Sequence, residues 1–253
     1  MTPFFMALGM FSIIPNPVKK WDEKKGREML LFMPVIGLII GALWSLLSLW
    51  IGSMELITPG GGVKGLFAAG VMAIFPLVLS GFIHLDGFMD VADAVLSRRD
   101  KERRIEILKD SHVGAFAVIM LVILGMLSLG VFSDVSLAGR EWILLFIPAV
   151  SRGTSVFFIY CLKPLKTSSY KKMHEEKLPP KYVVILLIEL LIFFVGAYLL
   201  VGRSALVLGI ELFAASIVVA VSAKNLGGMS GDISGSAITI SEIVAVAALL
   251  FIK

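Results

Sequence analysis

The sequence predicts an all-α fold: a polytopic helical bundle that forms a single integral membrane domain over residues 1–253. Composition is the first reason, because 58% of the residues are hydrophobic, only 17% are charged and the mean hydropathy is +0.94. Soluble domains are less apolar than this. The second reason is that apolar runs recur at the length of about 20 residues that a bilayer-crossing helix requires. The third is that basic residues gather in alternate loops between these runs.

Seven apolar runs are long enough to be transmembrane helices. They are Met29–Gly52, Gly65–His84, Gly114–Ser133, Glu141–Leu162, Val183–Val201, Ser204–Ser222 and Ser236–Ile252. The opening segment Met1–Pro15 is apolar but short and lacks the basic start of a cleavable signal, so we expect an interfacial or re-entrant segment. Gly37 and Gly41 have the small-xxx-small spacing that permits close helix contact. The single cysteine, Cys161, excludes an internal disulfide.

Basic residues indicate the orientation in the membrane. They gather before the first run and after the second, fourth and sixth runs. Most of the chain's 23 Lys and Arg are in these loops: Lys19, Lys20, Lys24, Lys25, Arg27, Arg98, Arg99, Lys101, Arg103, Arg104, Lys109, Lys163, Lys166, Lys171, Lys172, Lys177, Lys181 and Lys224. Because cytoplasmic loops are enriched in Lys and Arg, we expect these loops and the N-terminus to be cytoplasmic. The charge follows loops rather than one face, so no nucleic-acid partner is expected.

An acidic stripe follows the second run. Asp86, Asp90 and Asp93 are spaced i, i+4, i+7, which on a helix forms one stripe about 10 Å long. Three carboxylates placed this closely repel one another unless a cation lies among them. Oxygen ligands without cysteine favour Mg²⁺ or Mn²⁺ over zinc. His84, just before the stripe, is a further candidate contributor to the site.

A second polar segment, KDSHVG at residues 109–114, leads into the third apolar run on the same predicted face. It supplies another carboxylate, Asp110. Basic side chains lie between this segment and the acidic stripe along the chain. The candidate substrate contacts in this region are Arg98, Arg99, Lys109 and Ser111.

A glycine segment, NLGGMSGDISG at residues 225–235, follows the sixth run on the same face. Gly227, Gly228, Gly231 and Gly235 allow the backbone to approach a ligand closely, and successive N–H groups there could hold an oxyanion. Asp232 would add a metal ligand. Carboxylates for metal, amides for phosphate and nearby arginines are what phosphoryl transfer requires. The chain lacks the sequence G-x-x-x-x-G-K-[ST], so an ordinary P-loop ATPase is not expected.

Four charged residues lie inside the apolar runs. Glu189, Glu211 and Glu242 are costly to bury, so each should be paired, protonated or facing a polar cavity. Arg152 is a candidate partner for one of them and, alternatively, a candidate phosphate contact.

Three motifs resemble one known family. Residues 84–93, HLDGFMDVAD, look like the H-L-D-G-x-x-D-x-x-D signature of the cobalamin synthase family, the adenosylcobinamide-GDP ribazoletransferases. Residues 98–116 resemble the family's next block, and residues 227–235 its G-G-x-[ST]-G-D-x-x-G block. The resemblance runs nearly end to end. Departures are Ala94 where glycine is common, Ser236 where alanine is common, and His112 where arginine is frequent.

The resemblance implies a Mg²⁺-dependent membrane enzyme of the last assembly step of cobalamin. Such an enzyme joins adenosylcobinamide-GDP to α-ribazole, or to its 5′-phosphate, and releases GMP. We hypothesise that one of the acidic stripe or Asp110 takes the hydroxyl proton. The metal ligands would be Asp86, Asp90, Asp93 and Asp232, and the phosphate contacts Arg98, Arg99, Lys109 and Arg152. Partners are then two small molecules and membrane lipid, with a homo-oligomer left open.

Two other classes of membrane protein fit the sequence less well. A CDP-alcohol phosphatidyltransferase should contain D-G-x-x-A-R followed by G-x-x-x-D-x-x-x-D, which is missing. An ion-coupled transporter would use Glu189, Glu211 and Arg152 as an intramembrane site. A transporter is expected to have its functional acids near mid-membrane, whereas the densest acids here lie at one surface.

Overall fold

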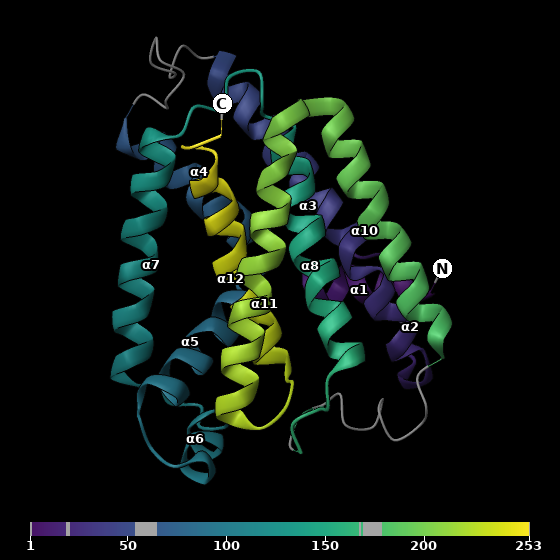
Figure 1. Cartoon of the computed structure of the whole chain (residues 1–253), viewed down its shortest axis with the longest axis vertical. Helices are drawn as coiled ribbons and strands as arrows, with labels where there is room; N and C mark the ends of the chain where they lie inside the picture. The colour runs from purple at the N-terminus through teal and green to yellow at the C-terminus, as the bar shows by residue number, and fades with distance from the viewer. Residues whose placement is uncertain (1, 19–20, 54–64, 167, 169–178, 253) are drawn as a thin grey trace.

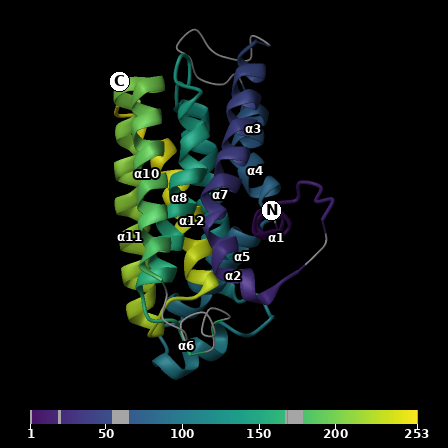
Figure 2. The same cartoon turned by 90° about the vertical axis from the view of Figure 1, so that its right-hand side faces the viewer.

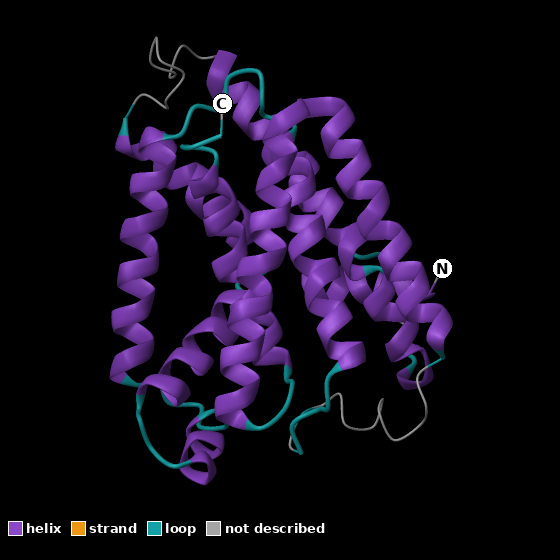
Figure 3. Cartoon of the chain, in the orientation of Figure 1, coloured by secondary structure: helices purple, strands orange, loops and turns teal. Residues whose placement is uncertain are grey.

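The chain is a bundle of α-helices, as predicted. The computed structural model describes residues 2–18, 21–53, 65–166, 168 and 179–252, and these ranges contain helices and loops but no strand (Figure 3). A single isolated bridge pairs Pro164 with Met229.

Most of the longer helices run side by side along the long axis of the molecule (Figure 1). In chain order the helices are α1 (Thr2–Phe11), α2 (Gly26–Leu31), α3 (Met33–Ser53), α4 (Leu66–Leu79), α5 (Ile83–Leu96), α6 (Lys101–Ile107), α7 (Ala115–Asp134), α8 (Ile143–Cys161), α10 (Pro180–Val201), α11 (Leu206–Leu226) and α12 (Gly231–Ala248). Short 3₁₀ turns, η1 (Glu23–Lys25) and η2 (Gly202–Ala205), precede α2 and α11.

The predicted multi-pass architecture is confirmed, and the predicted number of about seven spans is approximate. Within the described residues, five helical stretches are long and apolar enough to cross a membrane, or six if the bent α4–α5 pair is one span. One of the five, Pro180–Leu226, is 47 residues long and contains both α10 and α11, which η2 joins. These two helices lie side by side in both views (Figures 1 and 2).

The second predicted run, Gly65–His84, is not one straight helix. The chain ends α4 at Leu79 and turns by 94° into α5. Two consecutive residues, Gly81 (φ 63°) and Phe82 (φ 60°), adopt left-handed backbone conformations, which stop an α-helix. The Phe82 N–H donates to the Leu77 carbonyl at 2.9 Å and closes the turn. The acidic stripe therefore lies on a separate helix that leaves the direction of the bundle.

Helix α8 lies at the centre of the bundle. Its apolar stretch is 83% buried, against 22% for α7. The predicted close contact at Gly37 and Gly41 is confirmed, because α3 packs there on the backbone of α8. A Cβ atom at either glycine would overlap the carbonyl oxygen of Pro148 or Leu145. Small residues are the usual means by which helices approach this closely in membranes.

Candidate active site

The crossing of α5 and α12 brings the acidic stripe to the glycine segment. A Cβ atom at Gly87 of α5 would lie 2.8 Å from the Cα atom of Asp232. A Cβ atom at Gly235 of α12 would lie 2.9 Å from the carbonyl oxygen of His84. Because both helices present glycine at the crossing, their backbones are in direct contact. Asp232 thus lies beside the stripe, although about 140 residues separate them in the sequence.

The carboxylates of the site act on one another electrostatically. Asp90 lies within range of the charges of Asp86, Asp232 and Asp93. None of the ion pairs formed by the described residues includes a carboxylate of this group. Among the described residues the group is therefore a concentration of negative charge with no ion-paired cation, as the spacing of the stripe predicts.

These carboxylates are the residues of the site that could hold a metal ion. In the described part of the chain, no three His, Cys, Asp or Glu side chains converge closely enough to form a metal cage on their own. Mg²⁺ typically keeps several waters and is held by one or two carboxylates together with substrate phosphates. Asp86, Asp90, Asp93 and Asp232 supply carboxylates of that kind.

The 109–114 segment packs against the far end of the stripe. A Cβ atom at Gly114, just before α7, would overlap the Asp93 carboxylate. Asp110 is exposed and binds His112: the ring Nδ1 lies 2.6 Å from the Asp110 Oδ1 atom, and the His112 backbone N–H donates to the same oxygen at 3.0 Å. These hydrogen bonds, the ring contact first, lower the pKa of Asp110. A lowered pKa makes Asp110 a weaker proton acceptor than an ordinary aspartate.

The glycine segment is held in place by backbone contacts. The Gly227 N–H donates to the Ala223 carbonyl at 2.7 Å as the chain leaves α11 with φ 90°. Gly228 lies against the backbone of Leu165, where a Cβ atom would come within 2.7 Å of its nitrogen. The Gly227 amide is thus engaged within the fold. Gly231 opens α12, whose Ser230 cap accepts from the Ile233 N–H at 3.3 Å.

The basic residues near the site divide into two groups. Arg104 donates to the Asn225 side chain, and Lys101 lies against Gly227, so α6 supports the glycine segment. Arg98, Arg99, Lys109 and Ser111 are exposed. Sequence reasoning missed the supporting role of Arg104 and Lys101. It also missed Gly87 and Gly114, whose only signal was glycine inside or beside a motif.

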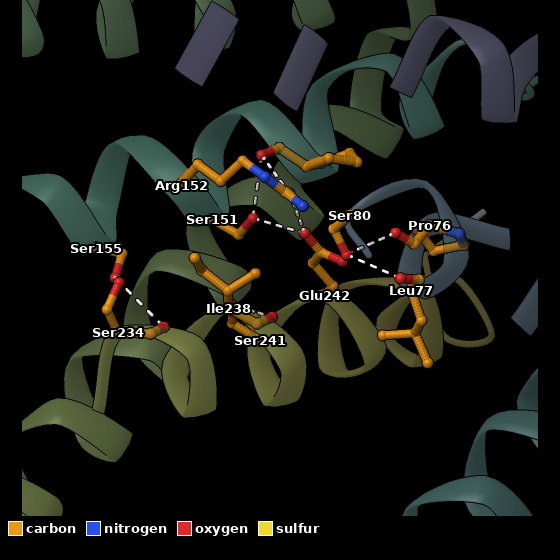
Figure 4. Close-up of polar contacts among 11 residues, drawn as sticks. Pro76, Leu77, Ser80, Ser151, Arg152, Ser155, Ser234, Ile238, Ser241 and Glu242 are labelled. Carbon is orange, nitrogen blue, oxygen red and sulfur yellow. Dashed lines mark hydrogen bonds and ion pairs between the residues drawn. The ribbon is translucent and has the colours of Figure 1, made fainter. Parts of the chain in front are cut away.

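Inside the bundle, Arg152 forms a buried ion pair with Glu242. The guanidinium Nη1 lies 2.6 Å from Glu242 Oε1, and the Ser151 hydroxyl donates to the same oxygen at 2.8 Å (Figure 4). The prediction that Arg152 pairs with an intramembrane glutamate is confirmed. Arg152 is only 1% exposed, so in this conformation its guanidinium is closed off from a substrate phosphate. Nearby, the hydroxyls of Ser155 and Ser234 are 2.6 Å apart and join α8 to α12.

His84 and Glu211 lie within range of the Arg152 charge, whereas Glu189 is on a different helix, α10. His84 is buried and its ring stacks on Phe11 of α1, with ring centroids 6.3 Å apart. Glu211 is fully buried, and neither of its carboxylate oxygens has a hydrogen-bond partner among the described residues. Glu189 is partly buried on α10. The transporter alternative joined Arg152 with Glu189 and Glu211, whereas the structure pairs Arg152 with Glu242.

The fold and the site together define a multi-pass membrane protein with a carboxylate-rich polar site where α5 crosses α12. The chain belongs to the cobalamin-5-phosphate synthase family, whose family model matches residues 3–250. The resemblance seen in the motifs is thereby confirmed. The protein is an enzyme, a transferase of cobalamin biosynthesis.

Similar proteins share nearly the full length of the chain. The adenosylcobinamide-GDP ribazoletransferase of Clostridium botulinum (strain Alaska E43 / Type E3) is 36% identical over 241 residues, which cover 94% of this chain and 93% of the relative. The protein of the same name in Clostridium perfringens (strain 13 / Type A) is 36% identical over 251 residues, which cover 95% of this chain and 94% of the relative. The protein of that name in Carboxydothermus hydrogenoformans is 31% identical over an alignment of 258 residues, which covers 100% of this chain and 98% of the relative. No solved structure matches the chain.

Proposed function

We propose that this enzyme transfers the cobinamide phosphate of adenosylcobinamide-GDP to α-ribazole, or to its 5′-phosphate, with Mg²⁺ as cofactor and GMP as the leaving group. The names of the relatives support this choice of substrates. The observation that carries it is the contact of Gly87 with Asp232, which gathers the carboxylates of two helices in one place.

The reaction makes one bond and breaks one bond at a single phosphorus. A ribose hydroxyl of the acceptor attacks the phosphorus joined to cobinamide, and the bond from that phosphorus to the GMP oxygen breaks. The hydroxyl proton passes to a carboxylate of the acidic stripe, and GMP leaves with the bonding electron pair. The products are the phosphodiester of adenosylcobalamin, or its 5′-phosphate, and GMP.

Acidic and basic residues have different roles in the proposed reaction. Asp86, Asp90, Asp93 and Asp232 would hold the metal, which when bound neutralises negative charge on the phosphate oxygens. The N-terminus of α12, which begins at Gly231, favours anions through its free N–H groups and helix dipole. Exposed basic side chains would bind the remaining phosphate oxygens. The candidates are Arg98, Arg99 and Lys109.

We further propose that the site faces the cytoplasm. Alternate loops rich in Lys and Arg support this orientation. The structure is consistent with it, because α6, the end of α8 and the loop between α11 and α12 lie toward the same end of the bundle (Figure 1). Part of the basic set lies outside the described residues: Lys19, Lys20, Lys171, Lys172 and Lys177.

Two aspartate variants test the proposed function. Asp90→Asn and Asp93→Asn each remove one negative charge with little change in shape, and we expect GMP release to fall about a hundredfold or more. Glu106→Gln is the matched control, since this exposed side chain forms an ion pair with Arg103 on α6, outside the acidic stripe. The assay follows GMP from both substrates with and without Mg²⁺. Wild-type rates of GMP release in both aspartate variants would contradict a catalytic role for these carboxylates. Solute uptake by vesicles that contain the protein, without GMP release, would favour a transporter.

A further inference from the structure

A hollow of about 450 Å³ lies at the Asp86 end of the acidic stripe. It is formed between the end of α1 and the turn that joins α4 to α5. Its walls include Met10, Ser12, Ser80, Phe82, Ile83 and Asp86. The volume is in the range of about 300–1,000 Å³ that small-molecule sites occupy.

The walls combine apolar side chains with polar groups, of which one is charged. The Ser12 hydroxyl donates to the Leu8 carbonyl at 2.7 Å, and the Ser80 hydroxyl donates to the Pro76 carbonyl at 2.9 Å, so both hydroxyl protons are engaged by the helix that precedes each serine. Met10 is 40% exposed and Phe82 is 48% exposed. The Asp86 carboxylate is the only charged group among the lining residues. A ligand that matches this hollow has an apolar part to pack on Met10, Phe82 and Ile83 and a hydrogen-bond donor for the Asp86 carboxylate.

The hollow is held open by contacts around it. The Ile13 N–H donates to the Leu79 carbonyl at 2.9 Å, which fastens the end of α1 to the end of α4. The Phe11 ring stacks on His84 of α5. Phe82 is held in a left-handed conformation that a bulky residue rarely adopts, with its ring exposed at the rim. Sites for small molecules are usually preformed in this way.

We propose that this hollow is the subsite for the aromatic base of the acceptor nucleoside, an inference that rests on the proposed function. The base packs among Met10, Phe82 and Ile83, and the ribose hydroxyls extend toward Asp86. This arrangement brings a hydroxyl to the end of the stripe where a carboxylate takes its proton. The N-terminal helix α1 thereby acts in acceptor recognition.

The proposed function assigns the donor's diphosphate to the metal held by the stripe and Asp232, which leaves the hollow to the acceptor. The acceptor hydroxyl has to reach the phosphorus held there, and the hollow adjoins the stripe at Asp86. A neutral aromatic base packs on the apolar part of the walls without bringing further negative charge to Asp86. For the same reason, the 5′-phosphate of the phosphorylated acceptor must point out of the hollow. A lipid chain would match the apolar part of the walls but would leave Asp86 without a partner.

Two substitutions test the subsite in the full-length protein reconstituted in phospholipid vesicles. Met10→Trp fills the hollow, whereas Phe82→Asn removes the ring and keeps a residue that tolerates the left-handed backbone. Met126→Trp on α7 and Phe213→Asn on α11 are the matched controls, because both side chains are exposed and neither lines the hollow. GMP release is measured against α-ribazole at saturating adenosylcobinamide-GDP, and then against the donor at saturating α-ribazole.

We expect both hollow variants to raise the KM for α-ribazole by about three- to tenfold, the size of a lost aromatic contact, with the donor KM unchanged. Both controls should keep the two KM values of wild type. The subsite would be overturned by an unchanged α-ribazole KM in the folded variants, by an equal rise in the donor KM, or by rises that the controls share. A shift only in the response to added phospholipid would assign the hollow to lipid. If wild type released no GMP at all, the proposed function itself would have failed.

Discussion

At the scale of single residues, the glycines of this chain differ in whether the fold has room for a Cβ atom. Gly87 touches the backbone of Asp232, and Gly114 touches the Asp93 carboxylate, so in both places a Cβ atom has no room. Gly125, on α7, has nothing within 4 Å of the position where a Cβ atom would be. The first two glycines set distances within the site, whereas the third leaves open space.

Gly87→Ala should therefore destabilise the protein and lower its activity. The added methyl group would force α5 and α12 apart, at a cost of about 1–3 kcal/mol for overpacking. Gly125→Ala adds the same methyl group in open space and is the control. Thermal unfolding in detergent and GMP release are the measurements. Equal melting temperatures for the two variants would show that α5 and α12 do not meet closely at Gly87.

The second prediction at this scale concerns pH. The hydrogen bonds from His112 lower the pKa of Asp110. This contact therefore contributes stability above the ordinary pKa of aspartate, and the contribution is lost as the pH falls through the lowered value. We expect His112→Ala to raise the titration midpoint of Asp110 toward about 3.9, as followed by NMR of the labelled carboxyl carbon. A midpoint that does not respond to the substitution would contradict the contact.

At the scale of helices, buried polar contacts join α8 to α12 inside an otherwise apolar bundle. The Arg152–Glu242 pair and the Ser155–Ser234 hydrogen bond both cross this interface (Figure 4). Asp232 lies on the same helix as Glu242, ten residues earlier. The placement of α12 against α8 therefore influences where Asp232 meets the acidic stripe.

Breaking the ion pair from one side should be more harmful than replacing it entirely. Glu242→Leu leaves a buried guanidinium without its counter-charge, and such losses cost about 3–5 kcal/mol. The double variant Arg152→Met/Glu242→Leu removes both charges and should recover most of the lost stability. Thermal unfolding of both variants in the same detergent provides the comparison. A double variant no more stable than Glu242→Leu would mean that the pair itself is needed for the fold.

At the scale of the whole molecule, the apolar runs predicted the membrane class and most of the helices. They could not reveal the 94° turn between α4 and α5, because an apolar residue is equally acceptable in a straight helix and in a bent one. Phe82 in a left-handed conformation gives no signal in the sequence, since glycine is the residue that usually marks such a position.

The spacing of Asp86, Asp90 and Asp93 on one helix, and the order of the motifs, are properties of the chain that can be read without coordinates. The partner of Arg152 and the contact of Gly87 with Asp232 depended on how the helices pack. The physical reason is that spacing along one helix follows from its regular geometry. The rotation and depth of one helix against another depend on the fit of their surfaces, and helices that are apolar on every side carry little pattern to specify it.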